Sequence, residues 1–352
     1  MATVDRIDAA ADIIRPSEVG GELALYYSQM AQTLFSGYGE LYRRLCQDHY
    51  DVLYYTASSS RLGHWKDLVG LWLARDNVET IIAHVHNGNF QKIFDHRPTR
   101  TTAQYLENST DAFLFTHRAL SRCAAGAIPP EKRLVVHNTI DASVRCSASE
   151  VRAKIERRQS RSTLRILFLG NLIPSKGYRD AVKALTHLSD ESREKVRFDL
   201  VGAWPDREVR CTFEDWLQAR NLQRQVHVHG KVTDRSRIKD FLLDADVFVL
   251  PTFYPNEAQP LTIIEAMNAG TPVVSTDHAS IPEYIRDGKN GYLVSKKSPP
   301  EIASAFEKLQ SIDDWTDKAR AARETYEETF AARSVRQQLF EAFRKAGVDL
   351  SD

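Results

Sequence analysis

Two glutamates, Glu257 and Glu265, stand eight positions apart in the stretch YPNEAQPLTIIEAMNAGTPVVST, which begins at Tyr254. A carboxylate near the start of a helix can accept both hydroxyls of a ribose, as acidic residues do in dinucleotide-binding folds. A carboxylate in the loop before that helix can hold the hydroxyls of a sugar. Taken alone, the pair could equally be two solvated surface acids, because acidic side chains favour the start of a helix. The elements that position the two side chains decide between these interpretations.

The flanking sequence predicts a strand, a loop and a helix. Residues 246–250 form a short apolar run typical of a buried strand, residues 251–260 a loop, and residues 261–268 a helix. Gly270 ends the helix, because glycine tolerates the left-handed backbone. The first glutamate is thus expected at the carboxyl end of the strand and the second about one turn into the helix. The N-terminus of that helix offers unpaired N–H groups that suit a phosphate.

Apolar runs and amphipathic stretches alternate along most of the chain. The runs that predict strands are residues 51–56, 80–85, 111–116, 134–137, 164–169, 196–201, 225–229, 246–250, 272–275 and 291–294. Two stretches place four apolar residues on one helix face, namely Trp65, Leu68, Val69 and Trp72 in residues 64–72, and Ala181, Val182, Leu185 and Leu188 in residues 180–188. Apolar strands that alternate with helices indicate an α/β protein with parallel sheets covered on both faces.

The alternating pattern falls into two lobes and a tail. The break between the two series is the polar, highly charged segment 142–163, which is typical of an interdomain connection. We therefore predict a Rossmann-like lobe over residues 1–150 and a second one over residues 160–314. Residues 315–352 contain no predicted strand, and their helices are expected to pack back on the first lobe.

Composition excludes several classes of protein. The 352 residues suffice for about two domains. Lys and Arg equal Asp and Glu at 47 each, so the net charge gives no reason to expect a nucleic-acid partner. No stretch approaches the roughly 20 apolar residues of a membrane span, and the N-terminus lacks a secretory pattern. The four cysteines have no spacing typical of a metal knuckle or a disulfide framework. We expect a cytoplasmic protein of enzyme size.

Five motifs between residues 164 and 294 resemble, in order, those of the family 4 retaining glycosyltransferases (group 1 glycosyltransferases), which have the GT-B fold. The motifs are RILFLGNLIPSKG from Arg165, LVGAWP from Leu200, VHVHGKV from Val226, DADVFVLPTFYPNE from Asp244 and TDHASIPEYIRDGKNGYLV from Thr276. The resemblance implies an α/β architecture of two Rossmann-like lobes that face a central cleft, with a helical C-terminal tail.

The resemblance also assigns a donor site to the second lobe. It implies that Lys176 neutralises the departing diphosphate, because charge that develops on a leaving group must be met by a fixed cation. By the same resemblance Glu265 binds the ribose and Glu257 holds the sugar. The donor-binding residues it implies are Gly170, Asn171, Lys176, Glu257, Ala258, Gln259, Pro260, Leu261 and Glu265, and those near the base are His229, Gly230 and Val232. No DxD-type signal lies near a strand end, so we expect no metal and no cofactor besides a nucleotide sugar, with UDP or GDP as its nucleotide.

The first lobe has two histidines at the end of a predicted strand. His84 and His86 lie on one face, but no third metal ligand is suggested by spacing, so a structural role is favoured for His84. His86 matches the family's histidine near the donor sugar and the acceptor, which implies a catalytic role for it. Its neighbours on the acceptor side are Asn87, Gly88 and Asn89. Other polar residues that follow strands, in residues 57–63 and 137–141 and at His117, are expected to be ordinary turn residues.

Three features depart from the family's pattern. Asn171 stands where the family has arginine, which removes a cation from the diphosphate site. Ala258 stands where the family has glycine, and its methyl group fits only if the backbone avoids positive φ. The chain also lacks a clear opening strand, because residues 3–7 are a poor strand and the first glycines are Gly20 and Gly21. We expect the opening strand and helix to be missing or degenerate.

The sequence therefore predicts a retaining, metal-independent hexosyltransferase that acts on a saccharide or lipid-linked saccharide in bacterial cell-surface polysaccharide or glycolipid synthesis. One alternative is a nucleotide-binding pseudoenzyme or partner subunit, since the opening unit and one cation are altered. A second alternative is a sugar-nucleotide epimerase of the same fold. Exposed residues of the first lobe (Tyr38, Tyr42, Arg43 and Arg44) are candidates for peripheral contact with the inner membrane face, although a solvated helix face is the simpler account.

Overall fold

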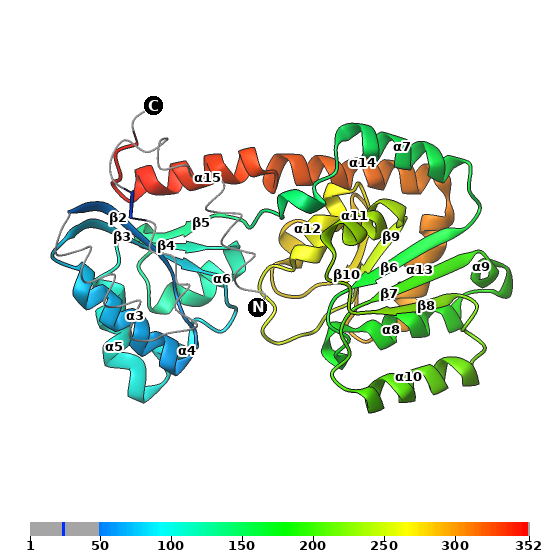
Figure 1. Ribbon diagram of the computed structural model, residues 1–352, viewed down its shortest axis with the longest axis horizontal. Helices are drawn as coiled ribbons and strands as arrows, with labels where there is room; N and C mark the ends of the chain where they lie inside the picture. The colour runs from blue at the N-terminus through cyan, green and yellow to red at the C-terminus, as the bar shows by residue number, and fades with distance from the viewer. Residues whose placement is uncertain (1–22, 25–48, 351–352) are drawn as a thin grey trace. The chain divides into compact units, whose positions relative to one another are not determined.

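The computed structural model describes residues 23–24 and 49–350, which form two compact units (Figure 1). The first unit holds the described residues up to Thr139, together with Asn256–Gln259 and those from Ala331 onward. The second holds Ile140–Pro255 and Pro260–Phe330. No helix among the described residues is both long enough and apolar enough to cross a bilayer. The predicted features at residues 3–7, Gly20, Gly21, Tyr38, Tyr42, Arg43 and Arg44 lie outside the described residues.

The first unit contains a five-stranded parallel sheet whose strands follow chain order, β1-β2-β3-β4-β5. Its strands are β1 (Leu23–Ala24), β2 (Tyr50–Thr56), β3 (Val78–Val85), β4 (Ala112–Phe115) and β5 (Arg133–Val135). Its helices are α3 (Arg61–Ala74), α4 (Lys92–Asp95), α5 (Arg97–Asn108), α6 (Arg118–Cys123) and α15 (Ala332–Lys345). Among the described residues, β1 pairs in parallel with β2, through Leu23 with Val52 and Ala24 with Leu53.

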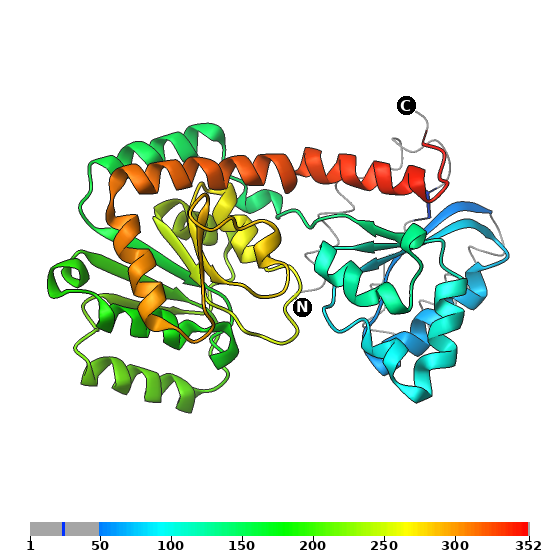
Figure 2. The ribbon, with the colours of Figure 1, turned by 180° about the vertical axis from the view of Figure 1, so that it is seen from behind.

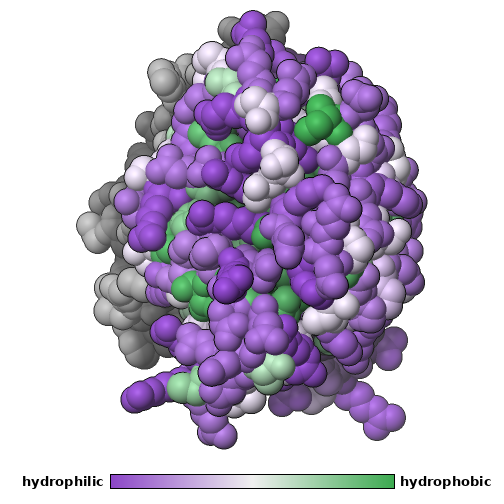
Figure 3. All heavy atoms as spheres, turned by 90° about the vertical axis from the view of Figure 1, so that its right-hand side faces the viewer, coloured by the Kyte–Doolittle hydropathy of each residue, from purple (hydrophilic) through white to green (hydrophobic). Residues whose placement is uncertain are grey.

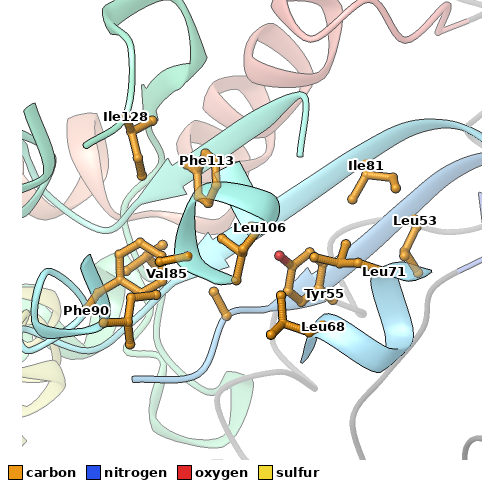
Figure 4. Packing of buried hydrophobic residues seen from close by; sticks show 14 of the residues in the cluster. Leu53, Tyr55, Leu68, Leu71, Ile81, Val85, Phe90, Leu106, Phe113 and Ile128 are labelled. Atoms are coloured by element: carbon orange, nitrogen blue, oxygen red, sulfur yellow. The ribbon is translucent and has the colours of Figure 1, made fainter. Parts of the chain in front are cut away.

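Alternate residues of the strands in the first unit point to opposite faces of the sheet, where they contribute to two separate hydrophobic cores. On one face Leu53 and Ile81 pack with Leu68, Leu71 and other residues of α3 and α5 (Figure 4). On the other face the residues in between, including Val52, Tyr54 and Ile82, pack with Val335, Leu339 and Phe343 of α15. This alternation follows from the two-residue period of a strand, and burial on both faces explains why the strands are apolar throughout.

The second unit contains a six-stranded parallel sheet with the order β11-β10-β9-β6-β7-β8. Its strands are β6 (Leu164–Leu169), β7 (Val196–Val201), β8 (Val226–Gly230), β9 (Val247–Leu250), β10 (Val273–Thr276) and β11 (Gly291–Val294). Its helices are α7 (Ala148–Gln159), α8 (Tyr178–Lys183), α9 (Asp190–Glu194), α10 (Arg207–Ala219), α11 (Arg235–Asp244), α12 (Leu261–Asn268), α13 (Pro299–Gln310) and α14 (Ile312–Thr329). The helices α13 and α14, orange in Figure 2, pack against each other.

The predicted strands and most predicted helices are confirmed. All ten strand predictions match observed strands to within two residues at each end, and the helix at residues 261–268 coincides with α12. Gly270 has φ 62°, the left-handed conformation expected of a residue that ends a helix. In the segment 180–188, Ala181, Val182, Leu185 and Leu188 are all buried.

The predicted interdomain connection at residues 142–163 is wrong. This segment forms α7 and packs inside the second unit, and the two units divide at Thr139 instead. Two of its charged residues, Lys154 and Arg158, are buried and bonded rather than solvated, whereas Arg152, Glu156 and Arg157 are exposed. The Nζ of Lys154 donates to the carbonyl oxygens of Leu242 and Ala269, both at 3.0 Å, and Arg158 is only 1% exposed.

The prediction that both C-terminal helices pack on the first lobe is wrong for one of them. Both helices form as expected, but only α15 packs on the first unit. The preceding helix, α14, belongs to the second unit and contacts α7, α12 and α13. Trp315 anchors it there, because its indole Nε1 donates to the backbone oxygen of Asp246 at 2.7 Å.

Candidate functional site

The strand order of the second unit creates a switch point between β6 and β9. The chain runs outward from β6 through β7 to β8, and then returns to place β9 on the other side of β6. Loops that leave two such strands diverge to opposite sides, which opens a crevice at their carboxyl ends where open α/β sheets bind ligands. Both loops at this point carry residues predicted for the donor site.

The two loops are bonded to each other. The N–H of Phe253, after β9, donates to the backbone oxygen of Ser175 at 2.8 Å. Gly177 has φ 77°, and a Cβ there would lie 2.3 Å from the backbone oxygen of Pro251, so only glycine fits. This packing fixes the backbone next to Lys176, which immediately precedes Gly177. The Nζ of Lys176 lies 5.1 Å from the centre of the Tyr254 ring. Gly170 and Asn171 begin the same loop, and Asn171 is exposed.

The helix α12 follows the second loop and begins without a side-chain cap. Pro260 occupies the N-cap position, and the N-cap residue makes no side-chain hydrogen bond to the first-turn amides, which start at Leu261. The amide groups and the positive end of the helix dipole are therefore suited to an anion.

Glu265 lies in α12 and is 4% exposed. Its Oε1 accepts a hydrogen bond from Nη2 of Arg235 at 2.7 Å. Burial raises the pKa of the Glu265 carboxyl, and the guanidinium of Arg235 opposes that rise. The carboxylate is thus a buried acceptor whose present partner, Arg235, has a side chain that is 40% exposed.

The residues predicted near the base lie where β8 ends. The imidazole of His229 bonds to Asp199 at 2.7 Å and packs edge-on against the Phe241 ring. Gly230 has φ 71°, and a Cβ there would meet open space. Its backbone oxygen accepts from the N–H of Gly202 at 2.9 Å. Val232 follows two residues later, so all three predicted residues sit at the same sheet edge as the loops of β6 and β9.

The structure separates Glu257 from Glu265. Asn256–Gln259 belong to the first unit, where they join the predicted acceptor-side residues. A Cβ on Gly88 would lie 3.0 Å from the backbone oxygen of Glu257, and Asn89 donates to the side chain of Asn256. Glu257 is therefore grouped with Gly88 and Asn89 in the first unit.

The neighbouring residue Gln259 is held by the turn that follows β5. Its Oε1 accepts from the N–H of Asn138 at 2.8 Å, and its Nε2 lies 3.0 Å from Nδ1 of His137. Ala258, between Glu257 and Gln259, does not have a positive φ. Its backbone therefore meets the condition under which alanine can replace the family's glycine. Polar residues after β5 thus position the segment that carries Glu257.

His84 and His86 differ in burial. His84 is 4% exposed, its Nδ1 bonds to the hydroxyl of Tyr54, and burial holds its pKa well below the usual range. This agrees with a structural role. His86 lies at the end of the strand with its ring centre 4.0 Å from that of His84, and Asn87 follows at the surface. In the part of the chain that the structure describes, no cluster of three or more His, Cys, Asp or Glu could hold a metal ion.

Arg235 is a further candidate site residue, which the sequence motifs did not single out. It is the first residue of α11 and follows β8 by five positions, and Asp234 caps that helix by accepting from the N–H of Ser236 at 2.9 Å. The signal was present in the sequence, because a capped helix start after a predicted strand must lie at the same sheet edge as the glutamate helix.

This architecture is that of the GT-B fold, and solved structures share it. HepE of Anabaena, solved with UDP, aligns with a TM-score of 0.71 at 18% identity over 88% of this chain and 82% of its own. Sucrose-phosphate synthase of Thermosynechococcus elongatus aligns with a TM-score of 0.66 at 18% identity, over 90% of this chain and 79% of its own.

The family model "Glycosyl transferases group 1" matches residues 152–328, about half of the chain, and the chain belongs to this family. The putative colanic acid biosynthesis glycosyltransferase WcaL of Salmonella typhimurium is 29% identical over 183 residues. That match spans 50% of this chain and 44% of WcaL. The 2-deoxystreptamine N-acetyl-D-glucosaminyltransferase of Niallia circulans is 23% identical over 78% of this chain and 70% of its own.

Proposed function

We propose that this chain transfers a sugar from a nucleotide-diphosphate sugar to a hydroxyl of a saccharide or lipid-linked saccharide, with retention of configuration and without a metal ion. One observation carries the proposal, namely the grouping of Lys176, the uncapped start of α12 and the buried Glu265 at the switch point. When the bond from the anomeric carbon to the diphosphate breaks, its electron pair goes to a phosphate oxygen. A fixed cation and a helix N-terminus stabilise that charge. The acceptor oxygen then bonds to the anomeric carbon from the face that the diphosphate leaves, and its proton passes to the released phosphate oxygen.

Two similarities support the choice of substrates. HepE structures contain UDP or UDP-glucose, which favours a uridine nucleotide, although a GDP-sugar fits the same chemistry. WcaL is named for the biosynthesis of colanic acid, which favours a role in bacterial cell-surface polysaccharide or glycolipid synthesis.

Under this proposal each predicted site residue has a specific binding role. In the second unit, Glu265 accepts the ribose hydroxyls in place of the guanidinium of Arg235, while the backbone from His229 to Val232 lies against the base. In the first unit, Glu257 with the amides that follow it holds the sugar, and His86 with its three neighbours faces the acceptor.

The test is turnover with labelled donors. UDP- and GDP-sugars are incubated with and without saccharide or lipid-linked acceptors in EDTA, and the anomeric configuration of the product is read by NMR. A product with the configuration of the donor is expected. An inverted product, or activity that EDTA abolishes, contradicts retention or metal independence. An isomerised nucleotide sugar without acceptor indicates an epimerase, and nucleotide binding without turnover indicates a non-catalytic subunit, which the exposed Asn171 would favour.

A further inference from the structure

The contact that Arg235 makes sets it apart from the exposed arginines of the second unit. Such arginines are common on this unit, and the face of it that Figure 3 shows is predominantly hydrophilic. The Arg235 side chain is 40% exposed, and its Nη2 donates to Oε1 of Glu265 at 2.7 Å. The side chain of Glu265 is only 5% exposed. Arg235 is therefore the half-exposed partner of a buried carboxylate.

The geometry of α12 places the Arg235 guanidinium near the uncapped start of this helix. Glu265 follows Leu261, the first residue of the helix, by one turn, so its backbone lies about 6 Å further along the axis. Side chains of an α-helix lean toward its N-terminus, which brings the Glu265 carboxylate back over the first turn. A phosphate bound by the first-turn amides would therefore lie within reach of the Arg235 side chain.

The charges around Glu265 require a cation if a phosphate is to bind beside it. Burial raises the pKa of the Glu265 carboxyl, the charge of Arg235 opposes that rise, and the charge of Asp141 adds to it. Two carboxylates and one guanidinium thus act on the proposed position of the ribose. A phosphate attached to the ribose would be repelled by both acids if the guanidinium were absent.

The loop after β6 supplies fewer cations than the family's pattern. Asn171 is exposed and neutral where the family has arginine, so Lys176 is the only basic residue between Leu169 and Gly177. One lysine carries a single charge, whereas a diphosphate has charged oxygens on both phosphorus atoms. A second cation therefore has to come from another element.

We infer that Arg235 binds the phosphate next to the ribose of the donor nucleotide, once the ribose hydroxyls have taken its place on Glu265. This inference rests on the proposed donor site. The guanidinium supplies from α11 the positive charge that the β6 loop lacks at Asn171, and Lys176 then meets the terminal phosphate. Arginine is suited to this role because its planar fork can donate two hydrogen bonds to one phosphate.

The experiment is calorimetry of uridine, UMP and UDP, or of the guanosine series if GDP is the nucleotide that binds. It is done at pH 8, so that Glu265 stays ionised when its partner is removed. Arg235→Ala should weaken UMP and UDP binding by the same factor, about 10- to 100-fold, the effect of one charged hydrogen bond. Uridine, which has no phosphate, should bind this variant at least as well as the unaltered protein, because it no longer displaces a guanidinium. Arg235→Lys keeps the charge and should recover part of the UMP affinity.

A matched control is Arg224→Ala, because this exposed arginine precedes β8 and so lies at the opposite edge of the sheet from the site. It should bind all three ligands as the unaltered protein does, and circular dichroism should be the same in all variants. The inference is overturned if Arg235→Ala binds UMP as tightly as the control. It is also overturned if uridine loses as much affinity as UMP, since Arg235 would then act only by positioning Glu265. In both cases the donor site itself stands, whereas an unaltered protein that binds no nucleotide overturns the proposed function as well.

Discussion

The two units are built from the same kind of parallel sheet but differ in strand order. In the first unit the described strands follow one another in chain order from β1 to β5, whereas in the second the order reverses so that β6 lies beside β9. Ligands of open α/β sheets bind where such a reversal separates the loops. The difference explains why the cation, the uncapped helix start and the buried carboxylate gather in the second unit.

The polar residues at strand ends are used differently as well. In the first unit His84 bonds to Tyr54, His117 caps α6 by accepting from the N–H of Leu120, and His137 bonds to the backbone oxygen of Thr116. All three maintain the fold. In the second unit the Nζ of Lys176 lies over the ring of Tyr254, and Glu265 forms an ion pair with the half-exposed Arg235. A bound ligand can replace both contacts. The polar residues that are candidates for donor binding therefore lie where the strand order reverses.

The largest expected effect tests whether the two units are independent. Asp246 is 1% exposed and accepts two hydrogen bonds from Nη2 of Arg161, at 2.5 and 2.6 Å, and one from the N–H of Arg165. Asp246→Asn should destabilise the second unit by about 3–5 kcal/mol, because it removes the carboxylate charge that faces the buried guanidinium of Arg158, 3.7 Å away. Asp244→Asn removes a carboxylate that is 61% exposed and should cost less than about 1 kcal/mol.

Urea unfolding followed by circular dichroism measures this difference. We expect the Asp246 variant to show an earlier transition for the second unit, while that of the first unit is unchanged. One transition that shifts as a whole would contradict the independence of the two units.

A pH effect of intermediate size is expected in the first unit, from Asp67. Burial raises the pKa of Asp67 to about 6, against the opposing effects of Lys66 and Ser58. Between the ordinary pKa and 6 the folded state holds a proton that the unfolded state has lost, so stability is full at low pH and falls as the pH rises through 6. The change should be roughly 2–3 kcal/mol. Asp67→Asn should remove this slope in urea titrations between pH 4 and 7, and an unchanged slope would contradict the assignment.

The third prediction separates Lys176 from other cations of its unit. Lys176→Ala should weaken UDP binding by about 10- to 100-fold, the effect of one charged hydrogen bond, and should weaken UMP binding much less. Lys183→Ala is the control, because that lysine is exposed on α8 in the same unit. Calorimetry with both nucleotides gives the comparison. Equal losses for UDP and UMP would show that Lys176 does not meet the terminal phosphate.

Much of the fold could be predicted because buried parallel strands are continuous apolar runs, as in β7, whose predicted and observed bounds agree. The segment 142–163 could not, since its charges resemble those of a solvated linker. Its packing depends on Asp246, about a hundred positions away, and a local pattern does not reveal such a partner. The sequence also did not show which face of α3 is buried, because apolar residues occupy both sides of this helix.

The candidate site was predictable in part. The resemblance and the spacing located Lys176 and Glu265, which lie at the switch point. The pairing of Glu265 with Arg235 was not predictable, because it depends on how two helices after different strands are oriented. That Glu257 belongs to the first unit was also not predictable. Only the four residues 256–259 of the loop are included in that unit, and their composition does not differ from that of the rest of the loop.

The proposed donor site is tested by calorimetric titration of UDP, GDP and ADP into the protein, into Glu265→Ala, and into Glu307→Ala as an exposed control from α13 of the same unit. We predict that one nucleotide binds, that the Glu265 variant loses this binding, and that the Glu307 variant retains it. If no nucleotide binds the unaltered protein, or if Glu265→Ala binds as well as the control, the switch point of the second unit is not the donor site.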